Sequence, residues 1–296
     1  MSGAIVSAGR RRHFWPRRLA SPSATVGAIL VIAVIAIALI GPFVAPYSPT
    51  SFVGASFAPP SLGFPLGTDD LGRDALSRVL WGGYRIIGLA VIATALGVLT
   101  GAMIGVISGY LGRAVDETLM RLVDVAMAFP QIILVLLFIS IIGAKLWLLT
   151  VMVAAVHAPQ VARVARAATL RVAQEDFVRF AEAIGTPLRR IVAFELFPNI
   201  VAQLMVECGL RFAYSISLIA GLNFLGFGVQ PPAADWGLMI NENRIGLLSN
   251  PWPVLAPILL IAVLTIGMNL LTDTLARTEL GHGIEAGPEA GVEMEQ

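Results

Sequence analysis

Long apolar runs separated by short polar segments make up most of the chain. A helix needs about 20 apolar residues to cross the hydrocarbon core of a bilayer. Six runs approach or exceed that length, and they predict membrane-spanning helices over 25–45, 84–110, 122–143, 146–162, 200–225 and 253–271. The third run is interrupted by Phe129-Pro130. The pattern therefore indicates an all-α integral membrane protein with six transmembrane helices.

Arginines orient these spans, because basic loops stay on the cytoplasmic side of a membrane. Residues 1–23 hold five arginines, and residues 162–199 hold six. With a cytoplasmic N-terminus, the loop after the fourth span and the C-terminus are also cytoplasmic, so both basic clusters agree on one topology. A cleaved signal peptide is the alternative for the N-terminus. We disfavour it because the apolar run is long and Pro46 and Pro49 crowd the place where cleavage would fall.

The same pattern divides the chain into segments. A basic cytoplasmic N-terminus (1–23) precedes the first transmembrane helix (24–46) and a polar extracytoplasmic segment rich in Pro and Gly (47–82). A core of five transmembrane helices follows (83–275), and it contains a cytoplasmic loop over 163–198. The tail over 276–296 is acidic and rich in small residues, which predicts a disordered cytoplasmic segment.

Composition narrows the function classes. Of the 296 residues, 57% are hydrophobic and 13% are charged, whereas a soluble domain has about 25% charged residues. The single cysteine, Cys208, excludes an intrachain disulfide, and the dispersed His13, His157 and His282 predict no metal site. The only lysine, Lys145, does not follow a glycine, so the chain has no Walker A loop. We expect no catalytic residue, metal, cofactor or nucleic-acid partner.

The polar loop between the fourth and fifth spans is patterned. One face of a predicted short helix carries apolar residues at i, i+3, i+4 and i+7, namely Phe177, Phe180, Ala181 and Ile184. Gly185 is expected to end this helix, with Thr186 and Pro187 as the N-cap and first turn of a second one. The apolar face fits a loop folded on its own bundle or on the lipid surface. It fits equally well a helix that docks on a soluble partner, and the pattern alone does not choose.

The fifth span is unusually polar. An arginine near the middle of the bilayer costs about 2.5–3.5 kcal/mol on insertion scales, so Arg211 needs a partner, and Glu207 one turn away can supply it. We expect this helix to face the interior of an assembly. Two interpretations remain open: a translocation path lined by Glu207, Arg211, Tyr214 and Asn223, or an internal ion pair with a structural role.

Other motifs have structural interpretations. Gly97, Gly101, Gly105 and Gly109 recur every fourth residue, which favours close helix packing over a ligand groove. His157 is expected to be a hydrogen-bonded residue near the inner end of its span, with a role in the path as the alternative. Trp236 and Trp252 fit an interfacial aromatic belt.

The segment over 65–78 carries three aspartates, Asp69, Asp70 and Asp74. A calcium loop would also need a glutamate at its last position, and none is there. The segment is instead typical of a turn followed by a helix, for which we predict Thr68 or Asp70 as the N-cap.

Three motifs resemble one family. Leu-Gly-Thr-Asp-Asp-Leu-Gly-Arg-Asp-Ala-Leu-Ser-Arg, over 66–78, resembles the segment after the first span in C-type permease subunits of dipeptide, oligopeptide and nickel importers. Residues 223–237 resemble another segment of these ATP-binding-cassette (ABC) permeases. Residues 177–185 with 197–199 resemble their EAA loop, with Arg179, Phe180 and Glu195 in place of the usual glutamate, alanine and histidine. The resemblance covers about residues 25–277.

The resemblance implies a type I ABC importer permease fold in a bacterial inner membrane. It implies that the chain forms half of a pore for peptides or similar small solutes, although nickel, opines and glutathione are also carried in this family. The implied partners are a second permease subunit, two ATP-binding subunits that hydrolyse the ATP, and an extracytoplasmic substrate-binding protein. The coupling helix would comprise Phe177, Phe180, Ala181, Glu182, Ala183, Ile184 and Gly185.

Two other classes compete with this reading. A self-sufficient secondary transporter or channel would often show internal repeats, and we find none. A membrane-embedded hydrolase would need a set of catalytic residues such as a Ser/His/Asp triad, and no such set stands out.

Overall fold

The computed structural model describes residues 21–285, with side chains described up to residue 277. Residues 1–20, with all the arginines of the basic N-terminus, and residues 286–296 of the acidic tail lie outside this range. Within it the fold is helical, and the only β-type pairing is two isolated bridges. The expectation of an all-α membrane protein is confirmed.

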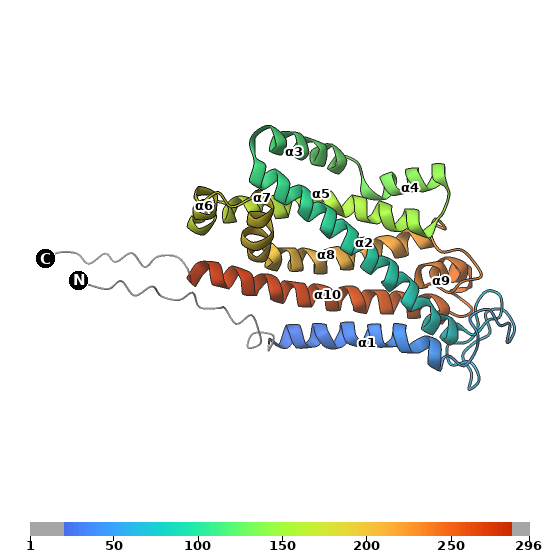
Figure 1. Cartoon of the computed structure of the whole chain (residues 1–296). Helices are drawn as coiled ribbons and strands as arrows, with labels where there is room; N and C mark the ends of the chain where they lie inside the picture. The colour runs from blue at the N-terminus through green and yellow to red at the C-terminus, as the bar shows by residue number, and fades with distance from the viewer. Residues whose placement is uncertain (1–20, 286–296) are drawn as a thin grey trace, which may run out of the picture.

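Five long helices form the bundle (Figure 1): α1 (Pro22–Val44), α2 (Ala75–Leu111), α5 (Leu146–Val172), α8 (Phe197–Phe224) and α10 (Trp252–Glu285). Each is long and apolar enough to cross a membrane. The pair α3 (Arg113–Met127) and α4 (Gln131–Ile142) passes the same test only as one broken span, bent by 82°. Six crossings result when this pair counts as one span.

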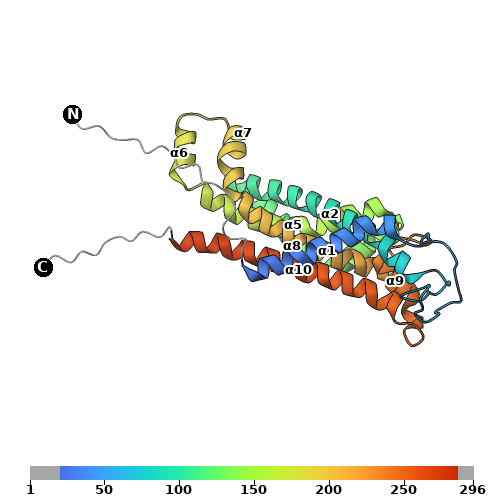
Figure 2. The same ribbon diagram turned by 90° about the horizontal axis from the view of Figure 1, so that it is seen from below.

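Short helices mark the two ends of the bundle. At one end lie α6 (Asp176–Ala183), α7 (Leu188–Arg190) and the π-helix η1 (Ile191–Leu196), as Figures 1 and 2 show. At the other end lie α9 (Trp236–Asn243) and the 3-10 helix η2 (Arg244–Gly246). The start of α1 and the end of α10 lie at the α6 end, as expected for an even number of crossings.

Several predicted boundaries are wrong because helices continue beyond the bilayer-length runs. Helix α2 begins at Ala75, inside the predicted external segment, and its N-cap is Asp74 rather than Thr68 or Asp70. The Asp74 carboxylate accepts the Ser77 amide at 2.8 Å and the Ser77 hydroxyl at 2.6 Å. Helix α10 continues to Glu285, so the predicted disorder is wrong for residues 276–285.

The third predicted span is broken at Phe129-Pro130, as the sequence indicated, and forms two helices. Pro130, whose ring excludes an N–H donor, is the N-cap of α4, and the 82° bend lies between Met127 and Gln131. On α3, Arg121 and Glu117 form an exposed i,i+4 ion pair of 2.6 Å. Figure 1 shows α3 and α4 as an outer layer over α2 and α5.

The glycine stripe of α2 packs directly on α5. A β-carbon on Gly101 would lie 2.5 Å from the carbonyl oxygen of Ala158, and one on Gly105 would lie 2.4 Å from that of Ala162. Gly97 and Gly109 meet the carbonyls of Ala154 and Arg166 in the same register, at 2.9 and 3.0 Å. Since any side chain would push the helices apart, the prediction of close packing is confirmed.

Candidate functional site

Helix α6 and the turn after it project from one end of the bundle (Figure 2). Gly185 ends the helix with φ of +79°, a backbone conformation that favours glycine. Two residues of α6, Val178 and Ala181, are buried in an apolar cluster with side chains of α2, α5, η1 and α8. Helix α6 is thereby anchored by small apolar side chains on one side.

The large apolar side chains of this region point away from the bundle. Phe180 and Ile184 are 66% and 65% exposed, and Phe177 and Leu188 are 41% and 47% exposed. We call these four residues the α6–α7 patch. Exposed basic residues accompany it along the same segment: Arg171, Arg179, Arg189 and Arg190. The patch is an apolar surface with basic neighbours, of the kind that a protein partner can cover.

Other residues of the predicted coupling helix have different positions. Ala181 was expected on the docking face but is only 7% exposed. It lies with Val178 on the side of α6 that packs against the bundle. Glu182 accepts a hydrogen bond from the Tyr110 hydroxyl of α2 at 2.6 Å, and Ala183 is exposed. Thr186 does not cap the next helix, whose N-cap is Pro187.

A cluster of polar side chains lies near the middle of α8. Arg211 donates from Nε to Glu207 at 2.9 Å and from Nη1 to Gln160 of α5. The side chains of the pair are 12% and 11% exposed. The guanidinium also stacks on the ring of Tyr214, 5.3 Å from its centroid, and Tyr214 itself is 59% exposed. The expected ion pair therefore forms, and its tyrosine neighbour reaches the surface of the chain.

Asn223, the fourth residue predicted for the path, is fully buried. Its side-chain amide donates to Asp235 at 2.7 Å, and its oxygen accepts the Val229 amide at 3.0 Å. Asn223 thus holds the loop between α8 and α9 closed and does not point into an open path. Burial raises the pKa of Asp235 to about 6.

Two further expectations are wrong. Trp236 is fully buried and donates from Nε1 to the Val79 carbonyl at 2.8 Å, so it belongs to the core rather than to an interfacial belt. His157 is 1% exposed, and neither ring nitrogen has a hydrogen-bond partner among the residues described. The expected hydrogen bond of His157 is absent from that part of the chain.

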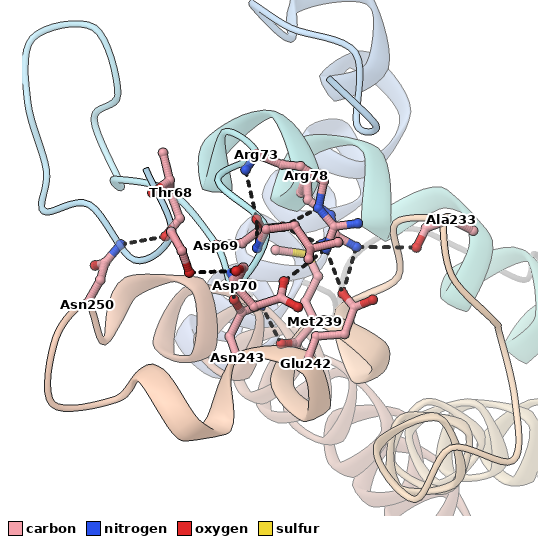
Figure 3. Close-up of polar contacts among 12 residues, drawn as sticks. Thr68, Asp69, Asp70, Arg73, Arg78, Ala233, Met239, Glu242, Asn243 and Asn250 are labelled. Carbon is pink, nitrogen blue, oxygen red and sulfur yellow. Dashed lines mark hydrogen bonds and ion pairs between the residues drawn. The ribbon is translucent and has the colours of Figure 1, made fainter. Parts of the chain in front are cut away.

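An ionic network ties the external loop to α9 (Figure 3). The Asp69 carboxylate accepts from Arg73 Nε at 2.6 Å and from Arg78 Nη1 at 2.5 Å. Arg78 Nη2 lies 2.8 Å from the carboxylate of Glu242 on α9. Asp69, Arg73 and Arg78 are at most 2% exposed, although all three carry charge. Burial raises the pKa of Glu242 above its usual range.

Neutral contacts extend the same network. The Asp70 amide donates to the Asn243 side chain at 2.9 Å, and Asn250 donates to the carbonyls of Leu66 and Thr68 at 3.0 and 3.1 Å. This network gives the 66–78 motif a structural role, which the search for caps or calcium ligands missed. Its partner on α9, Glu242, stands more than 160 positions away, and the sequence carries no local signal that pairs them.

Comparison with known proteins places the chain in a family. A family model described as "Binding-protein-dependent transport system inner membrane component" matches residues 101–279, and "N-terminal TM domain of oligopeptide transport permease C" matches residues 10–60. The chain belongs to this family of ABC-importer permeases. It is therefore a multi-pass membrane protein and a permease subunit.

Curated relatives extend over most of the chain. A dipeptide transport system permease protein, DppC, of Haemophilus influenzae is 32% identical over 271 residues, covering 89% of this chain and 92% of the relative. A glutathione transport system permease protein, GsiD, of Pectobacterium atrosepticum is 32% identical over 266 residues, covering 89% and 88%.

The fold has a solved counterpart. An inward-facing MetNI methionine ABC transporter chain aligns with a TM-score of 0.56 and 18% identity, covering 68% of this chain and 95% of that one. This match supports the type I importer permease fold.

Proposed function

We propose that this chain forms half of the translocation pore of a bacterial inner-membrane importer for peptides or similar small solutes. Relatives named for dipeptide, di/tripeptide and glutathione transport support this substrate range. The chain would pair with a second, different permease subunit. A substrate-binding protein would deliver the solute from outside, and two ATP-binding subunits would hydrolyse the ATP.

The α6–α7 patch is the observation that carries the coupling role. Phe177, Phe180 and Ile184 would be covered by the ATP-binding subunit, and each such side chain contributes roughly 1.5–3 kcal/mol when fully buried. Closure of the ATP-binding subunits would then displace α6. Because Val178, Ala181 and Glu182 attach α6 to the bundle, the displacement would reach the spanning helices.

The pore itself would run along the polar side of α8. Glu207, Arg211 and Tyr214 are our candidates for lining it. The Glu207 and Arg211 side chains are partly exposed and Tyr214 is largely exposed, which supports this choice. Asn223 is left out because its amide is used within the chain.

The test is co-purification of tagged permease with its ATP-binding subunits, followed by ATP-driven uptake in proteoliposomes. The triple variant Phe177→Ala, Phe180→Ala, Ile184→Ala should lose the ATP-binding subunits and uptake together. Phe43→Ala is the matched control, since that phenyl ring is 89% exposed at the opposite end of the bundle. Unchanged ATPase attachment and uptake in the triple variant would disprove the coupling role. Ion-driven uptake by the lone chain would instead favour a secondary transporter.

A further inference from the structure

Arg211 uses only part of its hydrogen-bonding capacity within the chain. A guanidinium has five N–H donors. Glu207 takes the Nε donor and Gln160 takes one donor of Nη1. In the described part of the chain Nη2 makes no hydrogen bond. The edge of the guanidinium formed by Nη1 and Nη2, which we call its outer edge, therefore retains free donors. Two N–H groups side by side on that edge match the two oxygens of a carboxylate.

Unpaired polar atoms lie about two helical turns from Arg211 on α8 and one turn from its partner Gln160 on α5. Gln203 is one turn before Glu207 on α8, and its Oε1 is buried without a partner among the described residues. His157 stands one turn before Gln160 on α5, and both of its ring nitrogens are buried and unpartnered within the same part of the chain. Buried polar atoms in proteins nearly always have a partner, so an added polar group is expected here.

A cavity shares one lining residue, Gln160, with the site. It has a volume of about 180 Å³ and lies between α5 and the α3–α4 break, lined by Gln131, Pro159 and Gln160 among others. Pockets that enclose a whole small-molecule ligand have volumes of roughly 300–1,000 Å³. This cavity has room for the end group of a solute, and Gln160 connects it to Arg211.

We propose that Arg211 binds a free carboxylate of the transported solute, such as the C-terminus of a peptide, at the outer edge of its guanidinium. The inference rests on the proposed function, for which it names the substrate class. Glu207 positions Arg211 from the Nε side and need not leave when the carboxylate arrives. The ammonium group of a zwitterionic peptide faces acceptors on the same helix side, Glu207 and Gln203 Oε1. The Glu207 carboxylate also offsets part of the positive charge of Arg211. Binding of the solute carboxylate is then weak enough for release, as transport requires.

The experiment uses the assembled transporter in proteoliposomes, with ATP inside and its binding protein outside. An equimolar dipeptide mixture and the same mixture with amidated C-termini are supplied, and uptake is read by mass spectrometry. Affinities of the isolated binding protein for both mixtures normalise the result. Wild type should favour free carboxylates roughly tenfold beyond the preference of the binding protein, because an amide leaves the guanidinium edge unpaired.

Arg211→Gln should remove that preference, while Arg211→Lys should keep part of it. Arg121→Gln is the matched control, because Arg121 also has an i,i+4 glutamate partner but both side chains are exposed. An assembled Arg211→Gln transporter with wild-type preference would overturn the proposal. So would an assembled, ATP-hydrolysing wild type that takes up neither mixture. Failure to assemble with ATP-binding subunits would instead count against the proposed function.

Discussion

Two groups of arginines, one at each end of this molecule, lie in opposite environments. At the external end, Arg73 and Arg78 are at most 2% exposed and are paired with Asp69 and Glu242 (Figure 3). At the cytoplasmic end, the arginines beside the α6–α7 patch are exposed. A buried charge is tolerated only with partners at hand. Arg73 and Arg78 have those partners in the same chain, whereas the exposed arginines beside the α6–α7 patch have no ion-pair partner among the described residues.

The most severe way to break the external network is to remove its central carboxylate. Asp69→Ala leaves Arg73 and Arg78 buried without their shared acceptor, and we expect a loss of about 3–5 kcal/mol in the free energy of unfolding. Thermal unfolding in detergent measures the loss. Glu117→Ala, which breaks an exposed pair, should cost at most about 1 kcal/mol. Equal effects of the two variants would refute the distinction between the ends.

The external end should also respond to pH through Asp235. Its pKa is raised by burial from 3.8 to about 6, so the folded state binds the proton more tightly than the unfolded state. The resulting stabilisation is complete below about pH 4 and is lost as the pH rises through 6, with a span of up to about 3 kcal/mol.

Asp235→Asn isolates this effect. The Asn223, Gly237 and Leu238 donors all bond to one carboxylate oxygen, which the amide oxygen can replace. The stability difference between wild type and variant should fall from pH 4 to 6, as followed by unfolding in detergent. A difference that stays constant over this range would contradict the raised pKa.

The glycine stripe of α2 lies between the two ends, and the effect of a larger residue in it can be measured. Gly101→Ala places a β-carbon 2.5 Å from the Ala158 carbonyl, so α2 and α5 must separate, at a cost of about 1–3 kcal/mol in unfolding free energy. Gly88→Ala is the control on the same helix, because no atom lies within 4 Å of its β-carbon. That change should be neutral or slightly stabilising.

The smallest stability effect is expected at the cytoplasmic end. Phe177→Ala, Phe180→Ala and Ile184→Ala remove exposed side chains, so each should change the unfolding free energy of the isolated chain by less than about 0.5 kcal/mol. Combined in the triple variant, they should abolish attachment of the ATP-binding subunits. A large destabilisation of the isolated chain would mean that the patch is structural and would remove the contrast with the external network.

Local patterns predicted what depends on neighbouring residues. The six apolar runs, the turn at Gly185 and the seam of glycines every fourth residue all follow from spacing along one helix. The Glu207–Arg211 pair follows for the same reason, since both residues are on one face of α8. In these cases the determining contacts lie within a turn or along a single face.

Features that depend on distant segments were not predictable in this way. Trp236 has the residue type of an interfacial anchor, but α9 folds back against Val79 and buries it. The sequence places Asn223 among the polar residues of a span. Its partner Asp235 is brought next to it by the loop between α8 and α9, which no local pattern predicts. Ala181 has the spacing of the docking face, and only the packing of α6 on the bundle shows that it turns inward.

Helix α2 is continuous from one of the compared ends to the other. Its 37 residues correspond to roughly 55 Å. Its first turn holds Arg78 of the external network, its last holds Tyr110 bonded to Glu182 of α6, and the glycine seam fixes its middle to α5. No turn or proline interrupts it to absorb a movement. Under the proposed function, a displacement of α6 would therefore reach the external network along one continuous helix.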